Sequence, residues 1–496
     1  MAGAPVSVEI PGAAELAGAR VAVVGLGKSG TACVQALAEA TEAVVSAWDA
    51  NERALESVGD VDERGAAADP AALAEKALAW KPDVVIPAPA VPEVGPLFER
   101  AARAGVPVWS EIELAWRLRA FDGGRAAPWL CVTGTNGKTT AVSMAEAILD
   151  AGGLKGKAVG NVGNPAVAEV SRTDGGAAGA FAVELSSFQL RTTRTMSPLA
   201  SICLNIADDH LEWHGSREAY WRAKARVYER VQAACVYPVG DSSVQRMVDQ
   251  ADVVEGARAI GLTLGVPSVG QIGLVEDAVV DRAFGPGRFR EAIELFSLGD
   301  LAQLAPAGAD LPAHIVCDAM AAAALGRAAG AGVAPEDVRA ALRAFRPGAH
   351  RIELAATVDG VRYVDDSKAT NAHAARASLG AQADGTTVWI VGGLAKGGRF
   401  EDLVADVSGK LRAVVVIGVD QEPWKSALAG IDVPVTYIDP ASPEPMDDAV
   451  AAARSHARRG DVVLLAPACA SMDQFASYAE RGERFAEAAR RNDGPH

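Results

Sequence analysis

The chain has 496 residues, which is too long for one hydrophobic core and predicts two to four domains. Half of the residues are hydrophobic and 22% are charged, as in ordinary globular proteins. The formal net charge of −16 argues against nucleic acid or an anionic membrane surface as a partner. No apolar run reaches the ~20 residues of a membrane-spanning helix, so we expect no membrane span.

The cysteine pattern predicts the compartment. No two cysteines form a C-x-x-C pair, and the first residues lack the basic head and apolar core of a signal peptide. We therefore expect a cytoplasmic protein with reduced thiols and neither a disulfide framework nor a zinc site. The six cysteines are Cys33, Cys131, Cys203, Cys235, Cys317 and Cys469.

The first predicted block alternates strands with helices, which is typical of a parallel sheet covered on both faces. A glycine loop, Gly25-Leu26-Gly27-Lys28-Ser29-Gly30, follows the first strand, and the second strand ends at Asp49. The loop and Asp49 match a dinucleotide fingerprint, although many α/β proteins bind other phosphates there. From these residues we predict only that a diphosphate approaches a helix N-terminus. Strands are expected at 20–24, 43–48, 83–86 and 106–109, and a turn-rich linker at 121–125.

The second block opens with a phosphate-binding loop. A short apolar strand at 129–132 precedes Thr133-Gly134-Thr135-Asn136-Gly137-Lys138-Thr139-Thr140, and a helix is expected over 139–149. Glycines let backbone N–H groups point at phosphate oxygens, the lysine supplies a mobile positive charge, and a threonine hydroxyl can bind Mg²⁺. We interpret the segment as an ATP loop, because a helix N-terminus favours anions.

Two further polar residues of this block come at the ends of predicted strands. Glu184 ends the strand at 181–185, and His210 follows the strand at 199–204. Open α/β sheets bind ligands at that edge, and Mg²⁺ prefers hard oxygen ligands such as Thr139 and Glu184. Lys224 belongs to a helix expected over 216–231, and its spacing alone predicts a solvent-exposed lysine. Another helix is expected over 315–329, a surface loop over 173–180, and mixed short elements over 255–310.

The third block is again doubly wound, with strands expected at 362–364, 387–391, 413–417 and 461–465. Asp366, Lys368 and Thr370 follow one strand, and Lys396 follows the next. Two lysines and a threonine at one sheet edge would receive carboxylates and phosphates. We therefore expect loops of two domains, one with ATP and one with positive charge, to close around a reaction.

Together these motifs resemble one family, the Mur ligases, across nearly the whole chain. Two of these motifs, residues 366–371 and 467–475, indicate the members of the family that add D-glutamate. The motifs that carry the resemblance are residues 133–140, 160–163, 184–189, 205–215, 349–351, 366–371 and 467–475.

The resemblance implies a fold and a reaction. The fold is α/β with three domains, each on a largely parallel sheet: a Rossmann-like UDP-binding domain (1–121), a P-loop ATPase-like domain (122–346) and a Rossmann-like amino-acid-binding domain (347–496). The reaction transfers the γ-phosphoryl of ATP to the carboxylate of UDP-N-acetylmuramoyl-L-alanine. The amine of D-glutamate then attacks this acyl-phosphate, with ADP and phosphate released. A monomer is expected.

The resemblance also implies roles for the nucleotide site. Residues 134–140, that is Gly134, Thr135, Asn136, Gly137, Lys138, Thr139 and Thr140, would bind ATP with Arg351, Asp366 and Lys368. Two Mg²⁺ ions would be held by Thr139, Glu184, His210 and Lys224, the last carbamylated by CO₂ into an anionic ligand. Lys138, Glu184, His210, Lys224 and Lys368 would be the catalytic residues.

The other substrates would bind elsewhere. UDP would bind Gly25, Leu26, Gly27, Lys28, Ser29 and Asp49 instead of NAD, and Asn161 and Ser187 would contact the muramoyl-alanyl arm. D-Glutamate would be surrounded by Lys368, Thr370, Lys396, Ser471 and Tyr478.

Three departures from the family pattern leave alternatives open. Ile315 and Asp318 replace asparagines that help to hold the nucleotide, residues 87–91 replace a Ser-Pro-Gly turn, and Tyr478 replaces a phenylalanine. One alternative is a paralogue that binds nucleotide or precursor, catalyses poorly and has a regulatory role. Another is a ligase that uses L-glutamate.

Overall fold

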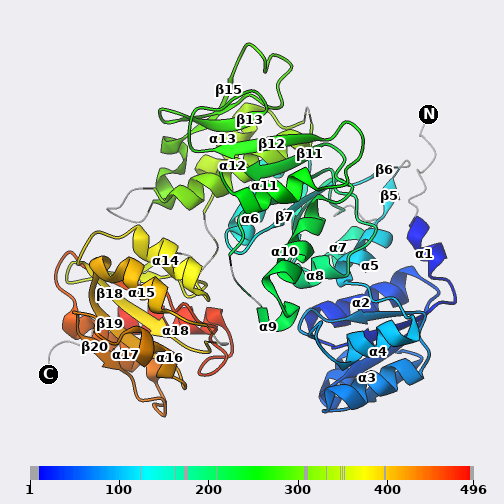
Figure 1. Ribbon diagram of the computed structural model, residues 1–496, viewed down its shortest axis with the longest axis horizontal. Helices are drawn as coiled ribbons and strands as arrows, with labels where there is room; N and C mark the ends of the chain where they lie inside the picture. The colour runs from blue at the N-terminus through cyan, green and yellow to red at the C-terminus, as the bar shows by residue number, and fades with distance from the viewer. Residues whose placement is uncertain are drawn as a thin grey trace. The chain divides into compact units, whose positions relative to one another are not determined.

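The computed structural model divides the chain into two compact units. The first comprises Met1–Asp300 and Cys317–Phe345, and the second comprises Leu301–Val316 and Arg346–His496. Figure 1 shows the chain coloured from blue to red along its length. The structure describes residues 10–122, 125–161, 163–172, 177–207, 209, 211–305, 311–330, 332–346, 348, 350, 352–395 and 398–491.

The first sheet is parallel throughout and buried on both faces. Side chains alternate along a strand, so Val21 and Val23 of β1 pack on one face and Ala22 and Val24 on the other. The sheet order is β3 (Glu63–Ala66), β2 (Val44–Asp49), β1 (Arg20–Val24) and β4 (Val84–Pro87). The helices are α1 (Pro11–Glu15), α2 (Lys28–Ala40), η1 (Glu52–Ser57), α3 (Pro70–Ala79), α4 (Pro96–Ala104) and α5 (Glu111–Arg117).

The second sheet has nine strands, and it begins after a two-stranded hairpin, β5 (Phe121–Asp122) and β6 (Arg125–Ala126). Seven neighbouring strands, from β8 to β13 in the order below, are parallel, and β14 and β15, from the segment expected to hold mixed short elements, extend the sheet through antiparallel pairings. The order is β15 (Ile293–Ser297), β14 (Ala278–Asp281), β13 (Gln271–Val275), β12 (Arg258–Thr263), β11 (Ala234–Pro238), β10 (Ala200–Cys203), β7 (Trp129–Thr133), β9 (Ala180–Glu184) and β8 (Gly156–Gly160).

Helices and 3₁₀ turns of varied length follow most strands of this sheet. They are α6 (Lys138–Ala151), α7 (Val167–Val170), α8 (Ser187–Arg191), α9 (Leu211–His214), α10 (Arg217–Ala225), η2 (Arg226–Tyr228), α11 (Ser242–Asp249), η3 (Leu298–Leu304), α12 (Ala313–Ala328) and α13 (Pro335–Ala344).

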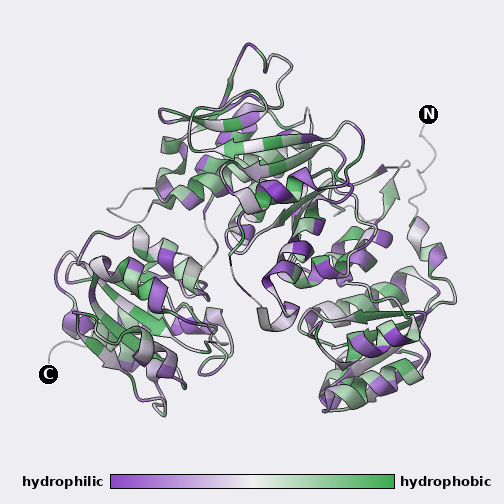
Figure 2. Ribbon diagram, viewed as in Figure 1, coloured by the Kyte–Doolittle hydropathy of each residue, from purple (hydrophilic) through white to green (hydrophobic). Residues whose placement is uncertain are grey.

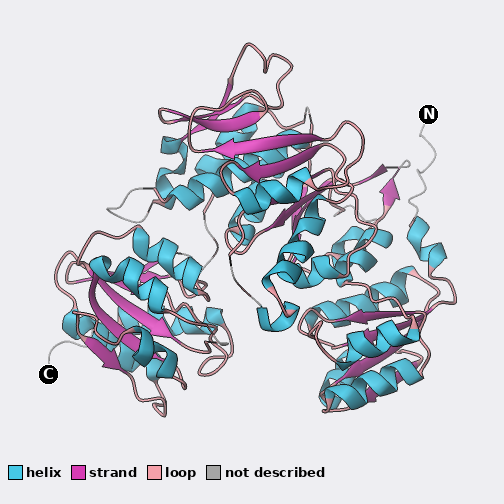
Figure 3. Ribbon diagram, in the orientation of Figure 1, coloured by secondary structure: helices cyan, strands magenta, loops and turns pink. Residues whose placement is uncertain are grey.

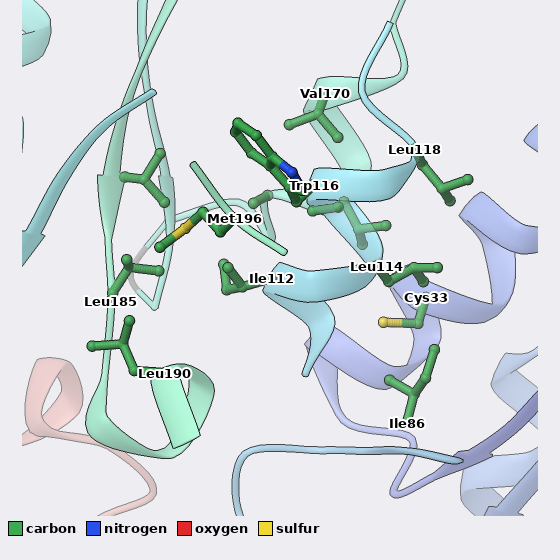
Figure 4. Close-up of a cluster of buried hydrophobic side chains, with 14 of the residues drawn as sticks. Cys33, Ile86, Ile112, Leu114, Trp116, Leu118, Val170, Leu185, Leu190 and Met196 are labelled. Carbon is green, nitrogen blue, oxygen red and sulfur yellow. The ribbon is translucent and has the colours of Figure 1, made fainter. Parts of the chain in front are cut away.

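Helix α5 joins the first two sheets through one continuous apolar core. Figure 4 shows Ile112 and Leu114 of α5 in a cluster with Cys33 of the first sheet's helices and with Leu185 and Leu190 of the second sheet's block. This shared core explains why both sheets belong to one unit.

Hydrogen bonds reinforce the same junction. Glu113 is fully buried, and its carboxylate accepts the N–H groups of Arg194 at 2.6 Å and Thr195 at 2.8 Å, as well as Arg117 Nε at 2.8 Å. A buried carboxylate with four donors, including the hydroxyl of Thr195 at 2.7 Å, is well satisfied, so α5 is fixed to the segment after α8.

The third sheet belongs to the second unit and is parallel except for its first strand. Helices α14 to α16 contribute side chains to the core on one face, and α17 and α18 to the core on the other. The order is β16 (Glu353–Val358), β17 (Val361–Asp365), β21 (Val462–Leu465), β18 (Thr387–Gly392), β19 (Leu411–Ile417) and β20 (Val435–Tyr437). The helices are α14 (Ala372–Gly380), α15 (Glu401–Val407), η4 (Ser408–Lys410), α16 (Glu422–Ala427), α17 (Pro445–His456) and α18 (Tyr478–Arg490).

The expected fold class, α/β with three largely parallel sheets, is confirmed (Figure 3). Hydrophobic residues concentrate in the strands, whereas the helices carry many hydrophilic ones (Figure 2). Among the described helices, none combines the length and apolar character that a membrane crossing requires.

Two elements expected from the sequence differ from those in the structure. The strand expected at 106–109 is reduced to one bridge, between Val108 and Val85, because Pro107 has no N–H and α5 starts directly afterwards. The helix expected over 216–231 is α10 followed by the 3₁₀ turn η2, and Arg230 beyond it has a positive φ of 55°. Of the loop expected at 173–180, residues 173–176 lie outside the described part.

The first glycine loop yields a test of packing. A Cβ on Gly30 would lie 1.9 Å from the carbonyl oxygen of Gly25, whereas a Cβ on Gly27 would meet nothing within 4 Å. We expect Gly30→Ala to lower the free energy of unfolding by roughly 3 kcal/mol through overpacking. Gly27→Ala should cost about 1 kcal/mol or less, as a lost helix cap. Urea denaturation measures both, and equal losses would contradict the proposed close contact.

Candidate functional site

The loop between β7 and α6 is held in shape by one asparagine side chain. Asn205 Oδ1 accepts the N–H groups of Thr135 at 3.1 Å and Asn136 at 2.9 Å, and its Nδ2 donates to the Asn136 carbonyl at 3.2 Å. Gly134 and Gly137 have φ values of 151° and 82°, which residues other than glycine rarely adopt. The remaining N–H groups at the start of α6 are in the position that favours an anion.

Two hydroxyl groups complete the support of this loop. Thr135 Oγ1 lies 3.0 Å from the hydroxyl oxygen of Tyr220 and accepts the Ala207 N–H at 3.0 Å. Sequence reasoning assigned no role to Asn205 or Tyr220. The available signal was that Asn205 follows β10, the parallel neighbour of β7, at the same sheet edge.

Two lysines bring positive charge to the loop. Lys138 Nζ donates to the carbonyl oxygens of Gly134 and Thr135, both at 2.9 Å. Lys224 Nζ donates to the Gly134 carbonyl at 2.8 Å and lies 3.4 Å from Thr133 Oγ1. The prediction of a solvent-exposed Lys224 is wrong, because α10 buries the face that carries this lysine. Burial, and secondarily the charge of Lys138, lowers the pKa of Lys224 to about 7.

The carboxylate of Glu184 lies at the end of β9 and is 1% exposed. Its Oε1 accepts Asn161 Nδ2 at 3.0 Å, whereas its buried Oε2 has no hydrogen-bond partner among the described residues. An unpartnered buried carboxylate oxygen suits a hard cation such as Mg²⁺, and Thr139, in the first turn of α6, offers a hydroxyl. His210 lies outside the described residues.

Asp318 lies against the same loop. A Cβ on Gly137 would be 2.4 Å from Asp318 Oδ1, and the aspartate is 4% exposed. The carboxylate that replaces one of the family's asparagines therefore lies beside the phosphate loop.

A serine and a histidine form a pair that the sequence did not predict. Ser187 Oγ lies 2.9 Å from His214 Nε2, and both residues are buried. His214 Nδ1 lies 3.8 Å from Glu93 Oε2, and Glu93 Oε1 accepts Arg191 Nε at 2.5 Å. Residues 93, 187 and 214 are far apart along the chain, so only the fold reveals the arrangement.

The glycine loop of the first sheet is closed by Asp49. Asp49 Oδ2 accepts the Leu26 N–H at 2.6 Å and Oδ1 accepts the Asn51 N–H at 2.8 Å. Lys28, the first residue of α2, donates from Nζ to the Gly163 carbonyl of the second sheet's block. Ser29 follows it in the first turn of α2.

A small cleft, with a volume of about 10 Å³, lies between the first two sheets and is lined in part by Ala88, Phe98, Phe188 and Trp213. Glu111 also lines it, and burial raises the pKa of this carboxyl to about 7. Residues of the segment 87–91, which replaces the Ser-Pro-Gly turn of the family, also line this cleft and lie next to the glycine loop.

The second unit carries the predicted residues of the third block, and the structure places one of them, Lys368, near Tyr478. Lys368 Nζ lies 5.1 Å from the centre of the Tyr478 ring. Asp366 is buried and accepts a hydrogen bond from the Ser378 hydroxyl, and Ser471 is also buried. Thr370 lies in the same loop as Lys368, whose carbonyl accepts its N–H at 2.9 Å. Arg351 and Lys396 lie outside the described residues.

The described part of the chain contains one cluster with metal-ligand spacing, His350, Glu353 and Asp365. Its members bond to one another: His350 Nδ1 lies 2.7 Å from Asp365 Oδ2, and Glu353 Oε2 accepts the His350 N–H at 2.9 Å. The cluster is therefore satisfied by its own hydrogen bonds.

Two family models match the chain. The Mur ligase middle domain matches residues 132–261, and the Mur ligase, glutamate ligase domain, matches residues 350–469. The chain is 48% identical to the UDP-N-acetylmuramoylalanine–D-glutamate ligase of Streptomyces avermitilis, over 95% of this chain and 98% of the relative. It is 46% identical to the ligase of the same name from Streptomyces coelicolor, over 96% and 98%.

Solved structures share the fold. The UDP-N-acetylmuramate–alanine ligase of Thermotoga maritima matches with a TM-score of 0.53 at 17% identity, over 95% of this chain and 98% of that one. A murein peptide ligase from Psychrobacter arcticus matches with a TM-score of 0.52 at 16% identity, over 96% and 100%. At such identities the likeness concerns the fold alone.

The buried lysine yields a pH-dependent test. In the folded protein the pKa of Lys224 is about 7, whereas the usual pKa of a lysine is 10.5. The unfolded chain therefore keeps the proton on this lysine up to a higher pH than the folded protein does. Between these values, rising pH favours the folded state. We expect the wild type to gain up to about 1.4 kcal/mol per pH unit relative to Lys224→Met between pH 7 and 9. Urea denaturation in CO₂-depleted buffer measures this, and parallel pH curves would contradict it.

Proposed function

Because the chain belongs to the Mur ligase family and is an ATP-dependent ligase that forms amide bonds, we propose that it joins D-glutamate to UDP-N-acetylmuramoyl-L-alanine in peptidoglycan precursor synthesis. The observation that carries the proposal is the near-full-length match to relatives named for this reaction. The preformed phosphate loop with its two lysines supports it independently.

The first step that we propose is activation of the alanyl carboxylate. A carboxylate is a poor electrophile because its oxide is a poor leaving group, whereas the phosphate of an acyl-phosphate leaves readily. Phosphoryl transfer depends mainly on positioning and on stabilisation of charge. The N–H groups of α6 and the ammonium group of Lys138 supply both. Lys138 now bonds to loop carbonyls, so its Nζ exchanges these partners for phosphate oxygens.

Mg²⁺ binding is the next part of the proposal. Glu184 and Thr139 would hold one ion, and His210 and a carbamylated Lys224 a second. When bound, Mg²⁺ neutralises charge on the phosphates. The lowered pKa of Lys224 supports carbamylation, because only the neutral amine attacks CO₂, and at pH 7 an ordinary lysine is almost entirely protonated.

The remaining roles follow from the placement of the loops. We propose that Gly25, Leu26, Gly27, Lys28, Ser29 and Asp49 bind UDP, and that Asn161 and Ser187 contact the muramoyl-alanyl arm. The bonds of Asp49 to Leu26 and Asn51 support a role in shaping the UDP loop. Arg351, Asp366 and Lys368 would contact ATP, and Lys368, Thr370, Lys396, Ser471 and Tyr478 would surround D-glutamate.

We further propose domain bounds at 1–121, 122–346 and 347–496. The hairpin β5–β6 separates the first two sheets, and the change of unit after Phe345 supports the second bound. The cytoplasmic location and the monomeric state stay predictions from the sequence.

A second candidate function is a precursor- or nucleotide-binding paralogue with weak catalysis. The observation that favours it is the carboxylate of Asp318 beside Gly137, since a negative charge there opposes the binding of phosphates.

The experiment that tests the proposal is release of ADP and phosphate with UDP-N-acetylmuramoyl-L-alanine and each glutamate enantiomer. We expect release with D-glutamate and transfer of oxygen-18 from the alanyl carboxylate into phosphate. Lys138→Ala should lower turnover by at least about 10²-fold, because it removes charge stabilisation. Amide formation without isotope transfer would refute the acyl-phosphate route. Absence of turnover with D-glutamate would favour the paralogue, and turnover with L-glutamate alone would reassign the amino acid.

The Asp318 observation makes a separate prediction. Asp318→Asn removes one negative charge next to the phosphate loop while keeping the size of the side chain, so the KM for ATP should fall several-fold. Asp318→Glu keeps the charge and serves as the control. An unchanged KM for ATP in the asparagine variant would show that this carboxylate does not oppose nucleotide binding.

A further inference from the structure

Arg481 is among the most deeply buried charged side chains of the described residues, with 1% exposure. It lies in the first turn of α18, four residues after the helix cap Ser477. Burial of a cation is costly unless its donors are paired, so this arginine needs a structural reason. Burial lowers its pKa to about 10, which leaves it charged at neutral pH.

The guanidinium group uses its donors on two loops. Its Nε donates to Ser367 Oγ at 2.9 Å and its Nη2 to the Ser367 carbonyl at 2.8 Å. Its Nη1 donates to the Cys469 carbonyl at 3.1 Å. A planar fork with fixed donor directions can hold two loops in register, which the single ammonium group of a lysine cannot do.

Ser367 extends the network to a third segment. Its hydroxyl donates to the Tyr478 carbonyl at 2.7 Å, and its N–H donates to Asp365 Oδ1 at 2.8 Å. The loop after β17 is therefore tied to the start of α18 both through Arg481 and directly.

A fourth segment, the loop after β18, is fixed to the same place. Leu394 exchanges two backbone hydrogen bonds with Ala470, at 2.9 and 3.2 Å. A Cβ on Gly393 would lie 2.3 Å from the Ala470 carbonyl and 3.3 Å from Arg481 Nη1, so only glycine permits this approach.

These segments are the ones that carry the proposed amino-acid pocket. Ser367 immediately precedes Lys368, Cys469 lies two residues before Ser471, and Tyr478 starts α18. We propose that Arg481 is a positioning residue that sets the distances between Lys368, Ser471 and Tyr478 and thereby determines the affinity for the amino-acid substrate. This inference rests on the proposed function, because it takes D-glutamate as the occupant of that pocket.

The matched control is Arg412, a half-buried arginine of the same sheet whose partner, Asp461, is buried. Arg412 Nη2 donates to Asp461 Oδ1 at 3.0 Å, at the opposite ends of the strands, where β19 and β21 begin. Its removal also unpairs a buried group, but far from the loops at the strand C-termini. A general loss of stability would therefore affect both variants, whereas a change in the pocket would affect only Arg481 variants.

The test compares Arg481→Met, Arg481→Lys, Arg481→Ala and Arg412→Met in the full-length protein. We expect Arg481→Met to raise the KM for D-glutamate at least tenfold, with the KM for UDP-N-acetylmuramoyl-L-alanine within twofold of the wild type. Arg412→Met should leave both constants within twofold. Millimolar guanidinium added to Arg481→Ala should restore part of the lost affinity for D-glutamate.

The outcomes separate the two proposals. A wild type that does not use D-glutamate refutes the proposed function, and amide hydrogen exchange then tests the network directly. Exchange at residues 367–370 and 469–471 should be faster in Arg481→Lys than in Arg412→Met. If the wild type is active but the KM for D-glutamate is unchanged in Arg481→Lys and Arg481→Met, or rises equally in Arg412→Met, the inference is overturned. Should Arg481→Met not fold, Arg481→Lys decides alone.

Discussion

The nucleotide site depends on the bonds between the Asn205 side chain and the phosphate loop. A glycine-rich loop is flexible, and fixing it when a ligand binds would cost entropy. Asn205 removes much of that cost in advance, because its one amide group bonds to the backbone of both Thr135 and Asn136. Lys138, Lys224 and Glu184 then act on a loop whose geometry is already set.

Two buried basic side chains, Lys224 and Arg481, fix loops in a similar way. With a net charge of −16, the protein must gather cations locally wherever it binds an anion. Burial lowers the pKa of Lys224, and the buried Arg481 donates three hydrogen bonds to neutral oxygens of Ser367 and Cys469. In both places the basic group donates hydrogen bonds to backbone carbonyls, so it also shapes a loop.

The fold class and the loops could be predicted from the sequence because apolar strands and glycine motifs are local signals. The helix and strand around the phosphate loop were found within one or two residues. Spacing within α10 does not reveal which face meets the sheet, so the burial of Lys224 could not be predicted from spacing, and only the family resemblance assigned this lysine to the site. The Ser187–His214 pair and the bonds of Arg481 to Ser367 join residues distant in sequence, so no local pattern predicts them.

Helix α5 has a consequence for how the molecule melts. Because Ile112, Leu114 and Glu113 place it inside a core shared by two sheets, neither sheet can lose its packing while the other keeps it. Three sheets would then give two calorimetric transitions, one for the sheets joined by α5 and one for the sheet that carries Arg481. The part of the chain that unfolds cooperatively is therefore larger than a domain built on a single sheet.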